Sequence, residues 1–274
     1  MNATRPSDAS SFFVNPYIRR ELLGTPFDCL TLEETIAAAD EAMQRRKTLH
    51  HVCINVAKFI AMRSNPELDG DVRSSHLISV DGMGILWTAR LLGVPVPERV
   101  AGIDLMQGVI RLCEEKGYRP YFLGARHDVL LKSITHIKAD FPRLNTAGWR
   151  DGYFKPEDEC EVVAGIKSSR AHCLFIGMPT PRKERFLARF RDDLGVPFIM
   201  GVGGALDVLA GHVRRAPRVV QNIGLEWLFR TIQEPRRLGP RYLATNAAFA
   251  RLIAKELASR VWPYRRISGR KIFS

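Results

Sequence analysis

Polar residues and glycines follow several short apolar runs of this sequence, and they are the residues best placed to do chemistry. Asn55 follows HVCI, Asp81 follows HLISV, Gly124 ends YFLG, and Gly203 and Gly204 follow PFIMGV. If these runs are parallel strands, the residues lie together at the carboxyl edge of a sheet, where open sheets bind ligands. Glycines let backbone N–H groups approach an anion closely. The pattern favours a phosphate-bearing ligand, although tight strand–helix packing explains GVGGALD equally well.

Asp81 is the candidate for proton transfer. It follows an apolar segment and precedes a glycine, in the sequence DGMG, so its carboxylate is expected to face a cleft rather than the core. A carboxylate in such a position can act as a general base. It can equally serve as the N-cap of the helix that follows, because aspartate is a preferred N-cap residue. The local sequence leaves both roles open.

Arginines near turns are candidates for binding an anion, because a guanidinium presents several N–H donors in a fixed fork. Arg99 follows the proline-rich turn GVPVPE, and it either binds a phosphate or pairs with a carboxylate, which is the commoner role. A run of charges is usually a solvated face, but the prolines and glycine in GLEWLFRTIQEPRRLGPRY favour a site. These turn residues are expected to bring together Arg230, Arg236, Arg237 and Arg241.

Short apolar runs alternate with helical segments along most of the chain. A capping box at Thr31–Glu34 opens one helix, and Asp104 is predicted to cap another that ends near residue 117. The helix over 183–191 is expected to begin with two solvated residues, Lys183 and Glu184. This alternation predicts the α/β class, with a mainly parallel sheet and helices on both faces. The predicted strands are 51–55, 76–80, 121–124, 144–148, 173–177 and 197–201.

The sequence changes character after about residue 210. Two helices, 217–233 and 241–260, are predicted with no strand between them. The chain has 274 residues and a net charge of +12, and residues 214–271 hold 14 of its 41 basic residues but only three of its 29 acidic ones. We therefore divide the chain into a flexible N-terminal lead-in (1–16), an α/β domain (17–212) and a basic helical C-terminal appendage (213–274).

A basic C-terminal segment indicates an anionic partner: a phosphate, a nucleic acid or a membrane surface. A basic α/β nucleic-acid-binding protein is one function that fits. A nucleotide-cofactor dehydrogenase or methyltransferase fits less well, because GxGxxG is missing. The sequence has no apolar stretch long enough to span a bilayer, and five scattered cysteines predict reduced thiols in the cytosol. Trp262, Tyr264 and Phe273, among the last basic residues, are typical of an interfacial anchor.

Eight sequence blocks resemble, in order and approximate spacing, the WecG/TagA/CpsF glycosyltransferases, glycosyltransferase family 26. The resemblance covers roughly residues 25–245, and the last two blocks are the most specific. It implies a Rossmann-like α/β catalytic body and a C-terminal helical appendage that helps to close the site and meets the membrane. The blocks are CINVAKF, VDGMGILW, ERVAGIDLM, YFLGA, GWRDGYF, GMPTPRKE, GVGGALDVLAG and RAPRVVQNIGLEWLFRTIQEPRR.

The resemblance implies a role for each candidate residue. Asp81 matches the aspartate proposed as the general base for the acceptor hydroxyl, and arginines take the place of a metal ion in neutralising the leaving group. Two positions depart from the family pattern, because Cys53 stands where threonine is common and Lys183 where glutamine is common. The implied substrate-binding residues are Cys53, Asn55, Arg99, Gly124, Lys183, Gly203, Gly204, Arg230, Arg237 and Arg241.

By resemblance, the activity is the inverting, metal-independent transfer of a sugar from a UDP-sugar to a polyprenyl-diphosphate-linked saccharide. The donor sugar would be N-acetylmannosamine, its uronic acid or glucuronic acid, and the product would enter a cell-surface polysaccharide or exopolysaccharide. The lysine at position 183 favours an acidic sugar. The resemblance places the protein in the cytoplasm, peripherally on the inner face of a bacterial cell membrane, with an anionic membrane surface as partner. A homo-oligomer is left open, and no metal, cofactor or nucleic acid is expected.

Overall fold

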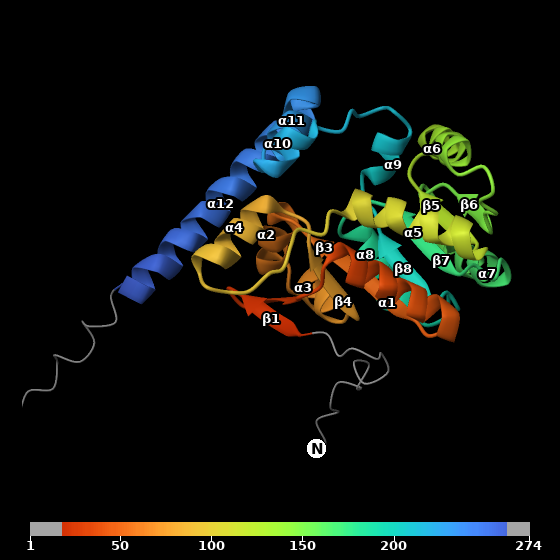
Figure 1. The fold of residues 1–274 in the computed structure, drawn as a ribbon, viewed down its shortest axis with the longest axis horizontal. Helices are drawn as coiled ribbons and strands as arrows, with labels where there is room; N and C mark the ends of the chain where they lie inside the picture. The colour runs from red at the N-terminus through yellow and green to blue at the C-terminus, as the bar shows by residue number, and fades with distance from the viewer. Residues whose placement is uncertain (1–17, 262–274) are drawn as a thin grey trace, which may run out of the picture.

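The computed structural model describes residues 18–261, which form the predicted α/β fold around a six-stranded sheet (Figure 1). The strand order is β4-β3-β8-β7-β5-β6, and each neighbouring pair is parallel. The lead-in 1–16 and the aromatic residues of 262–274 lie outside the described residues. The strands of the sheet are β3 (Leu49–Ile54), β4 (Leu77–Val80), β5 (Pro120–Gly124), β6 (Gly148–Arg150), β7 (Cys173–Gly177) and β8 (Phe198–Gly201).

Helices cover both faces of the sheet, because alternate side chains of its apolar strands point in opposite directions. In β7, Cys173 and Phe175 join a core with α1, α5, α6 and α9, whereas Leu174 and Ile176 join a core with α7 and α8. A third core lies between β3, β4 and the helices α2, α3 and α4. These helices are α1 (Leu32–Arg45), α2 (Val56–Ser64), α3 (Pro66–Arg73), α4 (Met83–Leu91), α5 (Gly102–Lys116), α6 (His127–Asp140), α7 (Glu159–Ser168), α8 (Arg182–Phe190) and α9 (Ala205–Leu209).

Two predictions about single elements are wrong. Helix α5 has Ala101 as its N-cap, and Asp104 lies in the first turn, where its side chain pairs with an arginine instead of capping. Strand β6 begins at Gly148 rather than at residue 144, because its register is set by pairing with β5, in which Tyr121 lies opposite Gly148. The capping box of α1 is confirmed, since Thr31 and Glu34 each bond the other's backbone N–H.

A hairpin that the sequence analysis does not predict precedes α1. It consists of β1 (Arg19–Leu22) and β2 (Thr25–Asp28), paired antiparallel. Arg19 donates to both carboxylate oxygens of Asp28 at 2.9 Å, and the same carboxylate accepts from the backbone of Ile78 at 2.7 Å. This buried aspartate therefore ties the hairpin to β4 at the edge of the sheet.

The C-terminal segment is helical, as predicted, but with different boundaries. The predicted helix 217–233 divides into α10 (Arg218–Asn222) and α11 (Glu226–Gln233) at Gly224, whose φ is +71°. A side chain at Gly224 would collide with Trp87 of α4, so glycine is required on both counts. Helix α12 (Pro235–Val261) begins earlier than predicted and continues through Pro240. Pro235 stands at the first helical position, where the N–H needs no partner, whereas Pro240 lies inside the helix.

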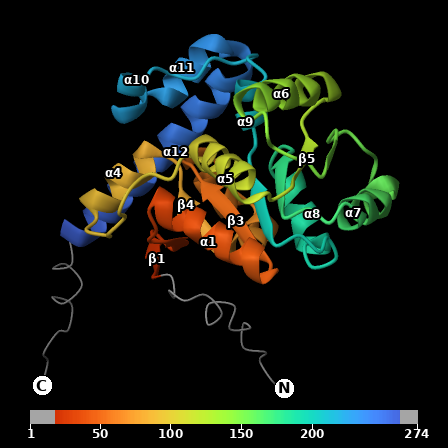
Figure 2. The same cartoon turned by 45° about the vertical axis from the view of Figure 1, so that its right-hand side comes forward.

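Helix α12 packs along the body of the protein (Figures 1 and 2). Phe249 contacts Phe59 of α2 edge to face, with ring centroids 5.3 Å apart, and Arg260 donates to the backbone oxygen of Leu92 at 3.0 Å. The appendage therefore shares the third core with the α/β body. No helix within residues 18–261 combines the length and the apolar character that crossing a bilayer requires.

Candidate active site

The carboxyl edge of the sheet brings the predicted residues into one row. Asp81 follows β4, Asn55 follows β3, Gly203 and Gly204 follow β8, and Gly124 ends β5. In the strand order, β4, β3 and β8 are successive neighbours, so the first three positions adjoin one another. The backbone N–H of Asp81 donates to the oxygen of Ile54 at 2.9 Å, which fixes the end of β4 against β3.

Asp81 is not a helix cap. The N-cap of α4 is Gly82 and has no side-chain cap hydrogen bond, so the carboxylate is free for another role. It accepts a hydrogen bond from the backbone N–H of Gly102, and a Cβ atom at Gly102 would lie 3.6 Å from Asp81 Oδ2 and 3.5 Å from Cys53 Sγ. Burial raises the pKa of Asp81 to about 6, with Arg99 opposing and Glu226 reinforcing the rise. A carboxylate with that pKa is suited to general base catalysis near neutral pH.

Arg99 and Arg230 meet at one carboxylate beside Asp81. Arg99 Nη1 donates to Glu226 Oε2, and Arg230 Nη2 donates to Glu226 Oε1, each at 3.1 Å. Arg99 comes from the loop before α5, whereas Glu226 and Arg230 are one turn apart in α11. The structure therefore brings together two of the predicted arginines through Glu226, which the sequence analysis missed. The signal that could have found Glu226 is that it is one of only three acidic residues in the basic segment 214–271.

Arg215, in the segment before α10, is a further residue that the sequence analysis did not single out. Its guanidinium donates to Asp104 of α5 at 2.6 Å, and the Asp104, Glu226 and Asp81 carboxylates all raise the pKa of Arg215. Among the described residues, the Nε atoms of Arg215 and Arg230 are buried and have no hydrogen-bond partner. Three guanidinium groups, of Arg99, Arg215 and Arg230, thus interact electrostatically with Asp81, and two of them have unused buried donors.

Lys183 and Glu184 form a buried charge cluster, which corrects the prediction of a solvated helix start. Glu184 Oε1 accepts from Lys183 Nζ at 2.8 Å and from Lys58 Nζ at 2.9 Å, and the Glu184 side chain is 2% exposed. Gly201, at the end of β8, makes room for the lysine stem, because a Cβ there would lie 2.6 Å from Lys183 Cε. Lys58 and Lys183 also act on the Cys53 thiol, whose pKa is raised mainly by burial and then by Asp81.

The remaining candidate residues at the strand ends are Asn55, Gly203 and Gly124. Asn55 is the N-cap of α2, and its side chain accepts from the backbone of Lys58 at 3.0 Å. Gly203 has a φ of +51° with open space where a side chain would stand, so tight packing does not explain it. Gly124 has a φ of +81° and lies against the backbone of Gly177. Gly203 therefore keeps the ligand interpretation open, while Gly124 packs two strand ends together.

The arginines of the appendage do not gather at one place. Arg237 pairs with Glu234 at 2.6 Å, and its charge acts on Asp207 of α9, next to the glycine turn after β8. Arg241 is exposed, and no side-chain contact within residues 18–261 brings it to Asp81. Arg237 and Arg241 are kept apart because α12 is continuous through Pro240, so they lie on successive turns of one helix.

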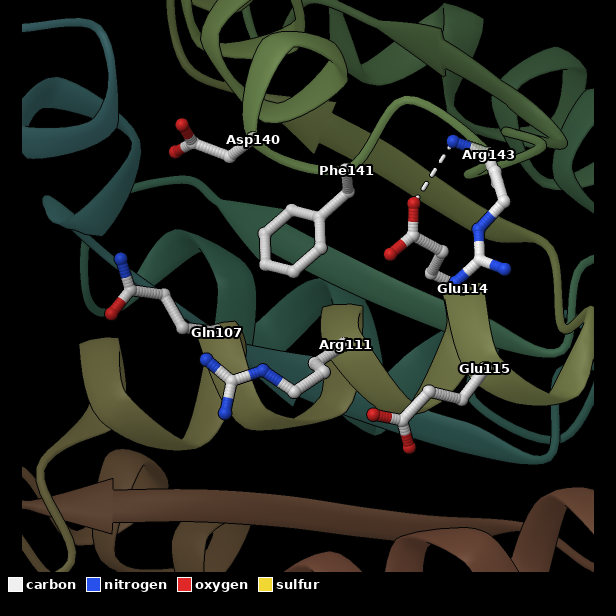
Figure 3. Close-up of a pocket in the computed structure, with 7 residues that line it drawn as sticks. All are labelled: Gln107, Arg111, Glu114, Glu115, Asp140, Phe141 and Arg143. Carbon is white, nitrogen blue, oxygen red and sulfur yellow. Dashed lines mark hydrogen bonds between the residues drawn. The ribbon is translucent and has the colours of Figure 1, made fainter.

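A separate hollow of about 500 Å³ lies between α5 and the end of α6 (Figure 3). Its lining contains both acidic and basic side chains, and the Glu114 carboxylate accepts from the backbone N–H of Arg143 at 2.9 Å. None of its residues contacts Asp81 or ends a strand, so we do not assign the active site to it. The lining residues are Gln107, Arg111, Glu114, Glu115, Asp140, Phe141 and Arg143.

Residues 20–262 match the model of the glycosyl transferase WecG/TagA/CpsF family, and the chain belongs to that family of glycosyltransferases. The family expectation from the sequence is thereby confirmed. A relative from Bacillus spizizenii (strain ATCC 23059 / NRRL B-14472 / W23) is 33% identical over 202 residues, which cover 72% of this chain and 77% of the relative. That relative is the N-acetylglucosaminyldiphosphoundecaprenol N-acetyl-beta-D-mannosaminyltransferase.

Proposed function

We propose that this glycosyltransferase moves a sugar, with inversion, from a UDP-sugar to a saccharide linked to polyprenyl diphosphate, as the name of the Bacillus relative suggests for its acceptor. The observation that carries the proposal is the placement of one carboxylate with raised pKa, Asp81, beside three guanidinium groups. The carboxylate supplies a base, and the guanidinium groups supply positive charge for a departing diphosphate. Family membership favours this function over nucleic-acid binding.

The proposed reaction needs one base and one stabilised leaving group. Asp81 takes the proton of the acceptor hydroxyl as its oxygen attacks the anomeric carbon from the face opposite UDP. The bond between the anomeric carbon and the β-phosphate oxygen breaks, and its electron pair leaves with UDP. Arg99, Arg215 and Arg230 stabilise the charge that develops on that oxygen, so the chemistry requires no metal ion. A single displacement from the opposite face inverts the anomeric centre.

The donor sugar is the finer part of the proposal. Lys58 and Lys183 share one carboxylate oxygen of Glu184, so this cluster of two ammonium groups and one carboxylate has a net positive charge. Both lysines also act on the nearby Cys53. We propose a donor with a carboxylate, such as a glucuronic or N-acetylmannosaminuronic acid, over neutral N-acetylmannosamine. Comparing turnover of UDP-glucuronate with that of UDP-N-acetylmannosamine tests this preference, and a clear preference for the neutral sugar rejects it.

Binding of UDP in the presence of EDTA is the experiment that tests the proposed function. Calorimetry should detect UDP binding by the wild type, about tenfold weaker binding by Arg230→Ala, and nearly unchanged binding by Asp81→Asn. Arg251→Ala removes an exposed arginine of α12 and is the matched control. Absence of UDP binding, together with steeply salt-dependent binding of RNA or DNA, would reject the enzyme function in favour of the nucleic-acid alternative.

We further propose that the protein is cytoplasmic and docks peripherally on the inner membrane face through the appendage, residues 213–274. Two observations support this location: the appendage is strongly basic, and α10 and α11 expose apolar side chains. Basic residues near an anionic bilayer contribute roughly 1 kcal/mol each. The division into domains and the formation of a homo-oligomer stay predictions. The most exposed of these apolar side chains are Val219, Ile223 and Ile232.

Replacing one exposed apolar residue should weaken membrane binding. Ile232 is 71% exposed on α11, so Ile232→Asp puts a charge at the proposed membrane contact without disturbing the core. We expect at least a threefold lower fraction bound in co-sedimentation with vesicles of phosphatidylglycerol and phosphatidylcholine. Leu131→Asp, at a position of α6 that is 41% exposed, is the control and should bind as the wild type does. Equal loss in both variants would reject the assignment to the appendage.

A further inference from the structure

Glu226 connects the two parts of the molecule at the site. Its carboxylate is mostly buried, with 15% of the side chain exposed, and it accepts from Arg99 of the body and from Arg230 of α11. Each carboxylate oxygen takes one guanidinium, at 3.1 Å. Two partly buried guanidinium groups repel one another unless an anion lies between them, so Glu226 is what allows Arg99 and Arg230 to lie side by side.

The bonds to Glu226 leave most of the arginine donors unused. A guanidinium has five N–H groups, and Arg99 and Arg230 each give one to this carboxylate. Among the described residues, Arg230 Nε is buried without a partner, as is Arg215 Nε nearby. Buried donors without partners are costly, and a ligand with several strong acceptor oxygens satisfies them.

We propose that Glu226 is a positioning residue, which holds Arg99 and Arg230 in a single orientation so that their remaining N–H groups bind the diphosphate of the donor. The inference rests on the proposed function and assigns to that same site a residue that closes it, because Glu226 joins the appendage to the body. Glu226 itself touches neither phosphate nor sugar in this role. Its loss should therefore affect donor binding more than the chemical step.

A charge effect on Asp81 accompanies the positioning. Removing the negative charge of Glu226 should lower the pKa of Asp81 from its value of about 6, since Glu226 is among the causes that raise it. The acidic limb of the pH profile of kcat/KM should then move to lower pH, which a purely structural role would not produce. The charged and titratable groups that face Asp81 are Cys53, Arg99, Arg215, Glu226 and Arg230.

The test compares Glu226→Gln, Glu226→Asp and the control Glu256→Gln. Glu226→Gln should weaken UDP binding and raise the KM for the UDP-sugar about tenfold, with kcat changed less than threefold, and should shift the acidic limb downward. Glu226→Asp keeps the charge but is one methylene shorter, so it should keep the wild-type limb and only partly restore binding. Glu256→Gln removes a carboxylate paired with Arg260 at the far end of α12 and should change neither readout.

The outcomes separate this inference from the proposed function. If the wild type binds no UDP, the proposed function falls and the inference falls with it. If the wild type binds UDP but Glu226→Gln binds it equally well, the inference alone is rejected. If Glu226→Gln binds UDP more tightly than the wild type does, Glu226 competes with the diphosphate for the arginines instead of positioning them. That outcome also rejects the inference.

Discussion

Replacing Asp81 by asparagine is expected to lower kcat roughly 10³-fold, because a general base in this position contributes about 10²- to 10⁴-fold. The amide keeps the size of the side chain and can still accept from the Gly102 N–H, so the fold should persist. Donor binding depends on the arginines and should change little. Turnover and UDP affinity measured on the same preparation therefore separate loss of the base from loss of the site.

The pH profile gives an independent check on this assignment. In the wild type, kcat/KM should fall about tenfold per pH unit below pH 6, because burial raises the pKa of Asp81 to about 6 and only the ionised form accepts a proton. The residual activity of Asp81→Asn should lack this limb. Asp192→Asn removes an exposed carboxylate just after α8, and it should retain both the wild-type rate and the acidic limb of the pH profile. Retention of more than a tenth of the wild-type rate by Asp81→Asn would mean that another group is the base.

The sequence was sufficient to predict where the strands end and which residues stand there. Apolar runs followed by a polar residue or a glycine are local signals, and parallel strands carry those residues to a common edge whatever the details of packing. Asn55, Asp81, Gly203 and the strand-ending Gly124 were found in this way. The layout of an α/β body with a helical appendage followed from the same alternation and from its disappearance after residue 210.

Contacts between distant segments could not be predicted in the same way. Arg99 and Glu226 are 127 residues apart, and only the packing of α11 against the body decides which acid an arginine meets. Lys183 and Glu184 look like a solvated helix start because their burial depends on Gly201 and Lys58, which belong to other elements. The predicted start of α12 was wrong because Pro235 begins the helix and Pro240 lies inside it, whereas proline usually interrupts a helix.

The buried cluster beneath Cys53 leads to the largest expected change in stability. Glu184→Gln should lower the free energy of unfolding by about 3 kcal/mol or more at pH 7, because it leaves the Lys58 and Lys183 ammonium groups buried with no negative partner. The lysines hold the pKa of Glu184 down to about 2 despite its burial, from an ordinary value of 4.5. The stabilisation is therefore complete above about pH 4.5 and is lost as the pH falls toward 2. Urea unfolding of both proteins at pH 7, 4 and 3 should show the difference narrowing in acid.

Lys183→Gln is the matched control, because it introduces the residue common in the family and removes the other side of the pair. Burial lowers the pKa of Lys183 to about 8, so its ammonium is costly to hold in the fold at pH 7, and Lys58 still neutralises Glu184 in its absence. We expect Lys183→Gln to leave the free energy of unfolding nearly unchanged or to raise it. The double variant of Lys183→Gln and Glu184→Gln should regain part of the stability that Glu184→Gln loses. Equal destabilisation by the two single variants would mean that packing of the stems, and not the balance of charge, holds α8 to the sheet.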